Sequence, residues 1–191
     1  MSWMQFYYAD PSPDRLVDEV RGFAAQGMLA HPHGASVIAV FLGRVMAAHP
    51  ERIAGWLAEL DGVARDTLRI AAWMSNTAEG RAAVADDPKL REPPADLLAC
   101  SIQEAQALDL FWAYYLATGE PRAVRRIVSA FELVGDPDAN NVAIFQRASQ
   151  TLVLLMRQHA PLRALVERMA GEPDLTANER QGIALALRAT P

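Results

Sequence analysis

The sequence predicts an all-α fold, built as stacked antiparallel helical hairpins in the manner of an α-α superhelix or solenoid. Apolar residues recur at helical spacing through most of the chain, and turns of a few residues separate these segments. β-branched residues are sparse, and no Asn-Gly or Asp-Gly turn lies between alternating apolar and polar runs. We therefore expect about nine or ten helices and no sheet.

The composition favours a single domain over residues 1–191. The chain has 191 residues, of which 51% are hydrophobic, so it can bury one sizeable core. Its one cysteine, Cys100, excludes an intrachain disulfide framework. The net charge of −5 argues against nucleic-acid or anionic-membrane binding, because each phosphate contact needs a Lys or Arg.

Targeting signals are not evident in the sequence. No run of 18 or more apolar residues occurs, so no membrane span is expected. The N-terminus lacks the basic and apolar regions of a secretory signal. We expect a cytoplasmic protein for the chain as given, and the mature part of an exported protein is the alternative.

The first helix is expected to begin at Pro13, with Ser12 as its capping residue, and to end at Gly27. The segment before it is aromatic, with Trp3, Phe6, Tyr7 and Tyr8. Two interpretations stay open for these rings. They cap the end of the core, or they form an arm that binds a partner.

Four further helices are expected in the first half. After a loop at 31–34, the second runs from about Ala35 to Ala48, and Pro50 begins the third, which Asp61-Gly62 closes. The fourth carries an apolar stripe, and a short fifth covers about residues 78–85. A segment with three prolines and six charges, residues 86–96, then interrupts the helical pattern. We interpret it as a surface crossing between two helical halves of one continuous stack.

The second half opens with its most apolar helix, from Gln103 to Thr118, which ends at Gly119. The next helix begins at Pro121 and ends at Gly135. A long helix over about 141–159 follows, with Asn140 or Asn141 as its cap, and then a short one led by Pro161. The run from Thr176 to Glu179 matches a capping box and begins the last helix, to about Ala189.

The motifs of metal and cofactor chemistry are missing from the sequence. His31 and His33 supply at most two zinc ligands, and His49 and His159 are expected at helix ends, where the helix dipole favours them. There is no Gly-rich phosphate loop and no Gly-x-Ser-x-Gly elbow. We expect no cofactor, no metal and no catalytic residues, and the chain leans towards a non-enzyme.

One polar residue breaks the local pattern: Asp109 stands between Leu108 and Leu110 in the most apolar helix. A buried carboxylate needs a partner, and the candidates are Arg122, Arg125 and Arg126 of the next helix. The first interpretation is structural pairing within this hairpin. The second is a binding pocket lined by Asp109, Trp112 and Tyr115, with Arg122 and Arg126 as further candidates.

The run from Leu108 to Glu120 contains the pattern Asp-x-x-Trp-x-x-aromatic-x-Ala-Thr-Gly, and Phe41 to Arg52 contains Phe-Leu-x-x-Val-x-x-x-x-Pro-x-Arg. Both stretches resemble segments of a family of small all-helical bacterial proteins. This resemblance covers about a third of the chain and implies no particular activity. The Ala-Thr-Gly-Glu turn is also similar to the hairpin turns of tetratricopeptide-like and HEAT-like repeats, which implies helical hairpins.

Two functions from different classes remain at this point. The first is a non-enzymatic protein-interaction or scaffold module made of helical hairpins. The alternative is a small-molecule-binding protein or enzyme with an inter-helical pocket near Asp109, Trp112 and Tyr115. A homodimer formed through the aromatic N-terminal arm is a third, weaker expectation.

Overall fold

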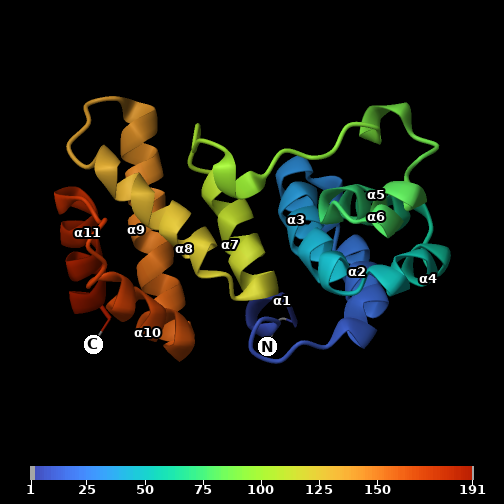
Figure 1. Cartoon of the computed structure of the whole chain (residues 1–191), viewed down its shortest axis with the longest axis horizontal. Coiled ribbons are helices and arrows are strands. Elements are labelled where there is room, and N and C mark those ends of the chain that lie inside the picture. The colour runs from blue at the N-terminus through green and yellow to red at the C-terminus, as the bar shows by residue number, and fades with distance from the viewer. Residues whose placement is uncertain (1–2, 191) are drawn as a thin grey trace. The chain divides into compact units, whose positions relative to one another are not determined.

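The computed structural model describes residues 3–190, and this part of the chain is all-α (Figure 1). It contains eleven α-helices and six short 3-10 helices, with no β-strand among these residues. The all-α prediction is therefore confirmed, with one or two helices more than expected. No helix of residues 3–190 is long and apolar enough to span a membrane.

The chain divides into two compact units, which are described separately. Unit 1 comprises residues 1–99 and 112–120, and unit 2 comprises residues 100–111 and 121–191. The boundary falls within helix α7 (Ala107–Thr118), between Phe111 and Trp112. The crossing predicted at 86–96 belongs to unit 1. That the two units form one domain, and one solenoid-like stack, stays a prediction.

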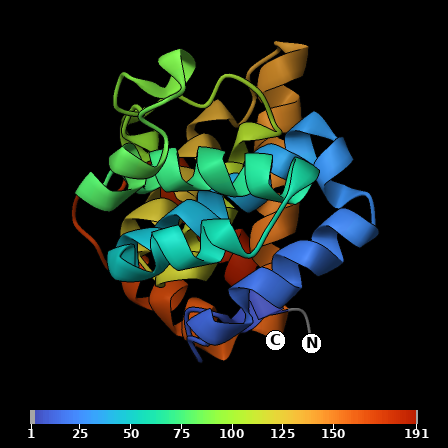
Figure 2. The same ribbon diagram turned by 90° about the vertical axis from the view of Figure 1, so that its right-hand side faces the viewer.

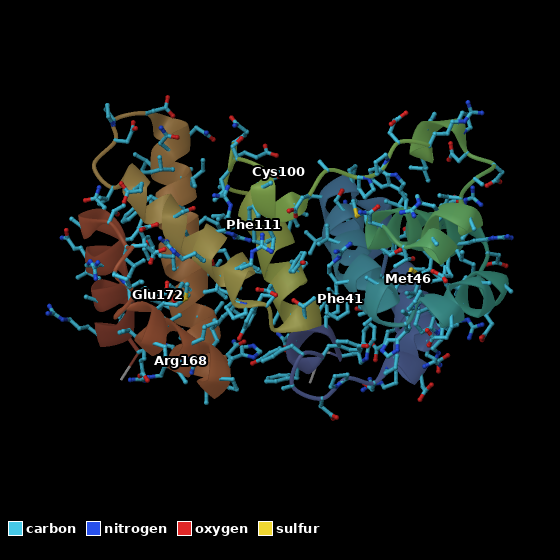
Figure 3. The ribbon with its side chains drawn as sticks, in the orientation of Figure 1. Phe41, Met46, Cys100, Phe111, Arg168 and Glu172 are labelled. Carbon is cyan, nitrogen blue, oxygen red and sulfur yellow. The ribbon has the colours of Figure 1, made fainter. Side chains whose placement is uncertain are left out.

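Unit 1 contains six helices before α7: α1 (Trp3–Phe6), α2 (Leu16–Ala25), α3 (Pro32–Ala48), α4 (Ile53–Ala58), α5 (Gly62–Ser75) and α6 (Ala78–Ala83). Phe41 and Met46 of α3 are fully buried, and Figure 3 labels both. Glycine lets the helices approach closely. A Cβ on Gly43 of α3 would lie 2.9 Å from the Met74 Cβ of α5, and one on Gly80 of α6 would lie 2.2 Å from the Ala72 carbonyl oxygen of α5.

Two of the four aromatic N-terminal residues, Trp3 and Tyr7, belong to the core of unit 1, whereas Phe6 and Tyr8 are partly exposed. Trp3 and Tyr7 are 5% and 3% exposed, and each makes an edge-to-face contact with Phe41, at centroid distances of 5.2 Å and 5.5 Å. The Trp3 indole N–H donates to the Ser12 hydroxyl at 3.1 Å. Ser12 makes no capping hydrogen bond at the helix that follows, so that prediction is wrong. The core interpretation of Trp3 and Tyr7 is confirmed.

The proline-rich segment 86–96 interrupts the α-helices as predicted and contains only a 3-10 turn, Pro88–Leu90 (Figure 2). Two side chains of α5 hold it. The Trp73 indole N–H donates to the Glu92 carbonyl oxygen at 2.6 Å, and Arg69 pairs with Asp86 at 2.7 Å. The segment is thus attached to α5 at its start and near its middle.

Unit 2 contains α8 (Pro121–Val128), α9 (Ala139–Gln158), α10 (Ala160–Met169) and α11 (Ala177–Arg188), with a 3-10 helix at Ser129–Leu133. The capping box at α11 is confirmed, since the Thr176 hydroxyl accepts from the Glu179 amide and the Glu179 carboxylate accepts from the Thr176 amide. Arg125 of α8 pairs with that carboxylate, with Nη1 2.5 Å from Oε1 and Nη2 3.1 Å from Oε2. This ion pair joins α8 to the first turn of α11.

The predicted helix ends at glycines agree with the structure. Several predicted helix starts do not. Gly27, Gly119 and Gly135 adopt the left-handed conformation expected after a helix, with φ of 72°, 69° and 77°. Several starts differ from the prediction. The helices expected from Pro13 and Pro50 open with 3-10 turns, and their α-helices begin at Leu16 and Ile53. Helix α3 begins at Pro32 and not at 35, α7 begins at Ala107 and not at 103, and the cap of α9 is Asp138, whose carboxylate accepts from the amides of Asn140 and Asn141.

Candidate functional site

Asp109, in the first turn of α7, forms an ion pair within unit 2. Its carboxylate accepts from Nη2 of Arg147 on α9, at 2.8 Å for Oδ1 and 3.0 Å for Oδ2. The Asp109 side chain is 21% exposed and that of Arg147 is 48% exposed. Nearby, the Asn140 side-chain amide donates to the Gln103 carbonyl oxygen at 2.8 Å. One contact therefore attaches the first turn of α7 to α9, and the other attaches the segment before α7 to α9.

The arginines expected to pair with Asp109 have other contacts in the structure. Arg125 pairs with Glu179, as described above. Arg126 donates to the Cys100 carbonyl oxygen, and its guanidinium carbon lies 5.8 Å from the centre of the Phe111 ring. Figure 3 labels Cys100 and Phe111. Arg122 is exposed in the first turn of α8. The partner shown for Asp109 is thus Arg147, which sequence reasoning did not consider because it lies 38 residues away.

Trp112 and Tyr115 lie in the part of α7 that belongs to unit 1. They are 5% and 2% exposed, and their rings meet edge to face at 6.2 Å. The Tyr8 ring lies 5.1 Å from the Tyr115 ring, and the Tyr8 amide donates to the Leu116 carbonyl oxygen at 3.0 Å. Burial raises the pKa of Tyr8, against the lowering effect of a hydrogen bond with Tyr115. These contacts attach α7 to the N-terminal segment of unit 1.

The five predicted site residues are therefore divided between the units. Trp112 and Tyr115 belong to unit 1, and Asp109, Arg122 and Arg126 belong to unit 2. Within its own unit, Asp109 is engaged in an ion pair, and Tyr115 makes a tilted contact with Tyr8 and an edge-to-face contact with Trp112. These contacts favour a structural role for the motif, but the ion pair shown for Asp109 joins α7 to α9 and lies outside the hairpin in which pairing was expected.

Replacing Asp109 tests that interpretation. We expect Asp109→Ala to lower the free energy of unfolding by about 0.5–1 kcal/mol, because a partly exposed pair contributes only that much. Arg147→Ala should cost a similar amount, and the double variant should lose little more than either single variant. Thermal unfolding followed by circular dichroism measures all three. Unchanged stability in Asp109→Ala would refute the structural role.

A surface pocket that sequence reasoning missed lies within unit 1, between α2, α4 and α5. Its volume is about 590 Å³. Most of its lining consists of apolar side chains, and its rim carries one basic and two acidic residues. The lining residues are Arg21, Ala24, Ala58, Glu59, Leu60, Asp61, Gly62, Val63 and Ala64. Figure 2 shows α4 and α5 side by side, joined by the short turn that forms part of this lining.

An exposed apolar surface continues from the pocket along α5. Val63 and Ile70 are 48% and 40% exposed, and a spacing of seven residues places them on the same side of the helix. Asp66 lies between them on that side and is also exposed. We call Val63, Asp66 and Ile70 the α5 face. The opposite side of α5 is buried, with Ala64, Leu68, Ala71 and Ala72. In the sequence, this face is indicated only by two apolar residues, Val63 and Ile70, that are seven residues apart and lie outside the set of buried positions.

The carboxylates around the pocket are uncommitted. Within residues 3–190, those of Glu59, Asp61 and Asp66 have no hydrogen bond or ion pair. Asp61 occupies the capping position of α5 and makes no side-chain capping bond there. Arg21, in contrast, is engaged, because it pairs with Asp18 at 3.2 Å and donates to the Glu59 carbonyl oxygen at 2.9 Å. The pocket is therefore a depression lined by both small apolar side chains and polar groups, with the unpaired carboxylates of Glu59 and Asp61 at its rim.

The described part of the chain offers no metal centre, since no three side chains of His, Cys, Asp or Glu are grouped there. His159, at the junction of α9 and α10, is 1% exposed. Burial lowers the pKa of its imidazole below the ordinary value. The neutral ring is therefore the form that the folded unit 2 favours.

Acidification should destabilise unit 2 through His159. Because the folded-state pKa is lowered, the unfolded chain binds more protons, and stability falls as the pH drops below about 6.5. We expect His159→Gln to flatten this dependence between pH 7.5 and 5.5, where the slope from one group is at most about 1.4 kcal/mol per pH unit. Denaturant unfolding at several pH values measures it. His31→Gln, at an exposed position, is the control and should keep the wild-type slope.

Comparison with known proteins identified no relative of this chain. No protein-family model matches the chain, and no match was found among curated proteins or solved structures. Function is therefore inferred from the surfaces of this chain alone.

Proposed function

We propose that the protein is a protein-interaction module and that it binds its partner through the α5 face. One observation carries this proposal: Val63 and Ile70 are both exposed on one side of a helix whose other side is buried. Apolar residues two helical turns apart are the anchors that helices present to protein partners. Single exposed apolar residues are common on protein surfaces, whereas apolar residues that lie together on one side of an element mark interaction sites.

The scaffold behind the α5 face supports the proposal. Helix α5 is held by close approach to α3 at Gly43 and to α6 at Gly80. Arg44 of α3 also donates to the Met74 carbonyl oxygen near the end of α5. A binding surface on a rigid element loses little conformational entropy when it binds. Unit 1 therefore presents the α5 face in a fixed shape.

The other expected functions have less support. The inter-helical pocket near Asp109, Trp112 and Tyr115 would use side chains that already have structural contacts within their own units. A homodimer through the N-terminal arm would use Trp3 and Tyr7, which are buried within their own unit. Both would require these contacts to open. The α5 face needs no such rearrangement.

Affinity enrichment from the cells that make this protein tests the proposed function. The bait is the full chain as wild type, as Ile70→Asp and as Leu154→Asp. Leu154 is an exposed leucine of α9 in unit 2, at 53% exposure, so it is a matched control. We expect one protein to be retained by wild type and Leu154→Asp and lost by Ile70→Asp. Binding of that protein, once purified, should weaken at least about tenfold with Ile70→Asp.

Two results would contradict the proposal. One is equal retention of every protein by all three baits, and the other is the absence of any retained protein. Circular dichroism establishes that Ile70→Asp is folded, since replacing an exposed residue should change the melting temperature little.

A further inference from the structure

We propose that the pocket between α2, α4 and α5 binds an apolar side chain from a basic segment of the partner, whose Lys or Arg residues pair with Glu59, Asp61 and Asp66. This inference rests on the proposed function, because it names the chemistry of the segment that binds beside the α5 face. It goes further in assigning both an apolar anchor and a charge to that segment.

Part of the pocket lining suits an apolar side chain of the partner. Ala24, Ala58 and Ala64 form walls of small side chains, and Leu60 adds a larger buried one. A volume of about 590 Å³ leaves room for a large aliphatic or aromatic side chain. Val63 belongs both to the pocket and to the α5 face, so the two surfaces are continuous. A segment that inserts one side chain into the pocket can therefore also cover Ile70.

The charge of the rim indicates a basic segment. The carboxylates of Glu59, Asp61 and Asp66 are free of bonds among the described residues, whereas the charge of Arg21 is paired with Asp18. Carboxylates that are exposed and unpaired cost nothing to the free protein, and they attract cationic groups of a partner. An acidic segment would meet unpaired like charge at two positions of the rim, Glu59 and Asp61, and at Asp66 on the α5 face. Repulsion therefore disfavours it.

The basic residues of α5 do not neutralise this rim. Arg69 forms an ion pair with Asp86, and the positive charge of Arg65 also acts on that carboxylate. The hydrogen bond from Arg69 is the largest of the effects that lower the pKa of Asp86, and the charge of Arg65 adds to it. Arg69 is thus paired with the proline-rich segment, and Arg65, two residues after Val63, projects from a different side of α5 than Val63 and Ile70. The α5 face keeps its negative charge.

The whole of unit 1 carries the same sign. It has 14 acidic and 9 basic residues, whereas unit 2 has 9 of each, so the net charge of −5 resides in unit 1. An electrostatic field of one sign raises the association rate of an oppositely charged partner. This effect becomes weaker as the ionic strength rises. Charge complementarity therefore operates at the pocket rim and over the surrounding surface.

Selection from a random peptide library displayed on phage, with the full chain as target, tests the inference. We expect the enriched peptides to contain one large apolar residue flanked by Lys or Arg. A selected peptide, labelled with a fluorophore, is then titrated with wild type and variants by anisotropy. Raising the salt concentration should weaken its binding, because part of the attraction is electrostatic.

Two pairs of variants assign the binding to the pocket. Ala58→Trp fills the pocket and should weaken binding at least about tenfold, whereas Ala54→Trp, one turn earlier on α4 and outside the lining, should not. The double variant Glu59→Lys with Asp66→Lys should weaken binding by a similar factor. Asp10→Lys makes one such charge reversal at an exposed residue of unit 1 outside the pocket, and should have little effect.

Several results would overturn the inference. They are an empty selection, enriched peptides that are neutral or acidic, and peptides that bind Ala58→Trp as well as wild type. Dimerisation in light scattering that Ala58→Trp abolishes would assign the pocket to a second copy of this chain and would also overturn it. None of these results decides the proposed function, which the loss of a retained protein on Ile70→Asp tests separately.

Discussion

Arg125→Met should lower the free energy of unfolding of unit 2 by about 2–3 kcal/mol, which is less than the cost of breaking a fully buried ion pair because Arg125 is partly exposed. The Glu179 side chain is 4% exposed and that of Arg125 is 27% exposed, so removing the guanidinium leaves a buried carboxylate. The capping-box bond from the Thr176 amide remains. Methionine keeps most of the apolar stem of arginine, so the loss reports on charge.

The pH dependence of this variant follows from the carboxylate. Burial raises the pKa of Glu179, but the hydrogen bonds from Arg125 and Thr176 and the charge of Arg125 outweigh it, and the net pKa is lowered. The stability that Glu179 contributes is therefore present at neutral pH and is lost as the pH falls through its lowered pKa. Without Arg125 the carboxylate protonates at a higher pH. The difference between wild type and Arg125→Met should therefore shrink from pH 7 towards pH 4.

Denaturant unfolding with two companion variants completes this test. Arg122→Met removes an exposed arginine of the same helix and should cost less than about 1 kcal/mol. Arg125→Met combined with Glu179→Gln should recover part of the loss, because the buried charge is gone. A loss in Arg125→Met no larger than that in Arg122→Met would refute the ion pair as a principal contact between α8 and α11.

Gly182→Ala should destabilise unit 2 by about 1–2 kcal/mol. A Cβ on Gly182 of α11 would lie 2.3 Å from Cδ2 of the Phe131 ring. Phe131 is 1% exposed and meets Phe145 of α9 edge to face at 6.1 Å, so its ring has no free space to move into. Alanine favours the helix by up to about 1 kcal/mol over glycine, but steric overlap in a core costs about 1–3 kcal/mol or more.

A double-variant cycle tests the cause of that loss. Phe131→Leu creates space beside Gly182, so Gly182→Ala should cost much less in that background. Gly55→Ala is the matched control, because α4 is helical there and a Cβ would have no neighbour within 4 Å. It should stabilise the protein by about 0.5–1 kcal/mol. Equal effects of Gly182→Ala and Gly55→Ala on the denaturant midpoint would contradict the close contact with Phe131.

The features predicted correctly from the sequence are those that depend on neighbouring residues in the chain. Left-handed glycines such as Gly119 and Gly135, and the capping box at Thr176, depend on residues within one turn, and all three were predicted. Sequence reasoning failed where a distant group decides. Ser12 was expected to cap a helix, but its hydroxyl accepts from Trp3, which the fold brings to it.

The candidate site shows the same limit. Helical spacing places Asp109 and Trp112 on one side of α7, but it does not reveal that the helix is divided between two compact units. The acid that pairs with Arg125 lies 54 residues away, and the arginine that pairs with Asp109 lies 38 residues away. The exposed pair Val63 and Ile70 was visible in the sequence. The structure is needed to show that the other side of α5 is buried and that Val63 and Ile70 therefore face outward.

Site-specific photo-crosslinking in the cells that make this protein tests the central claim most directly. A photoreactive amino acid replaces Ile70 in one variant and Leu154 in another, both exposed in wild type. The proposed function predicts that residue 70 crosslinks to one protein and that residue 154 does not. Absence of an adduct at residue 70, or the same adducts from both positions, would contradict it.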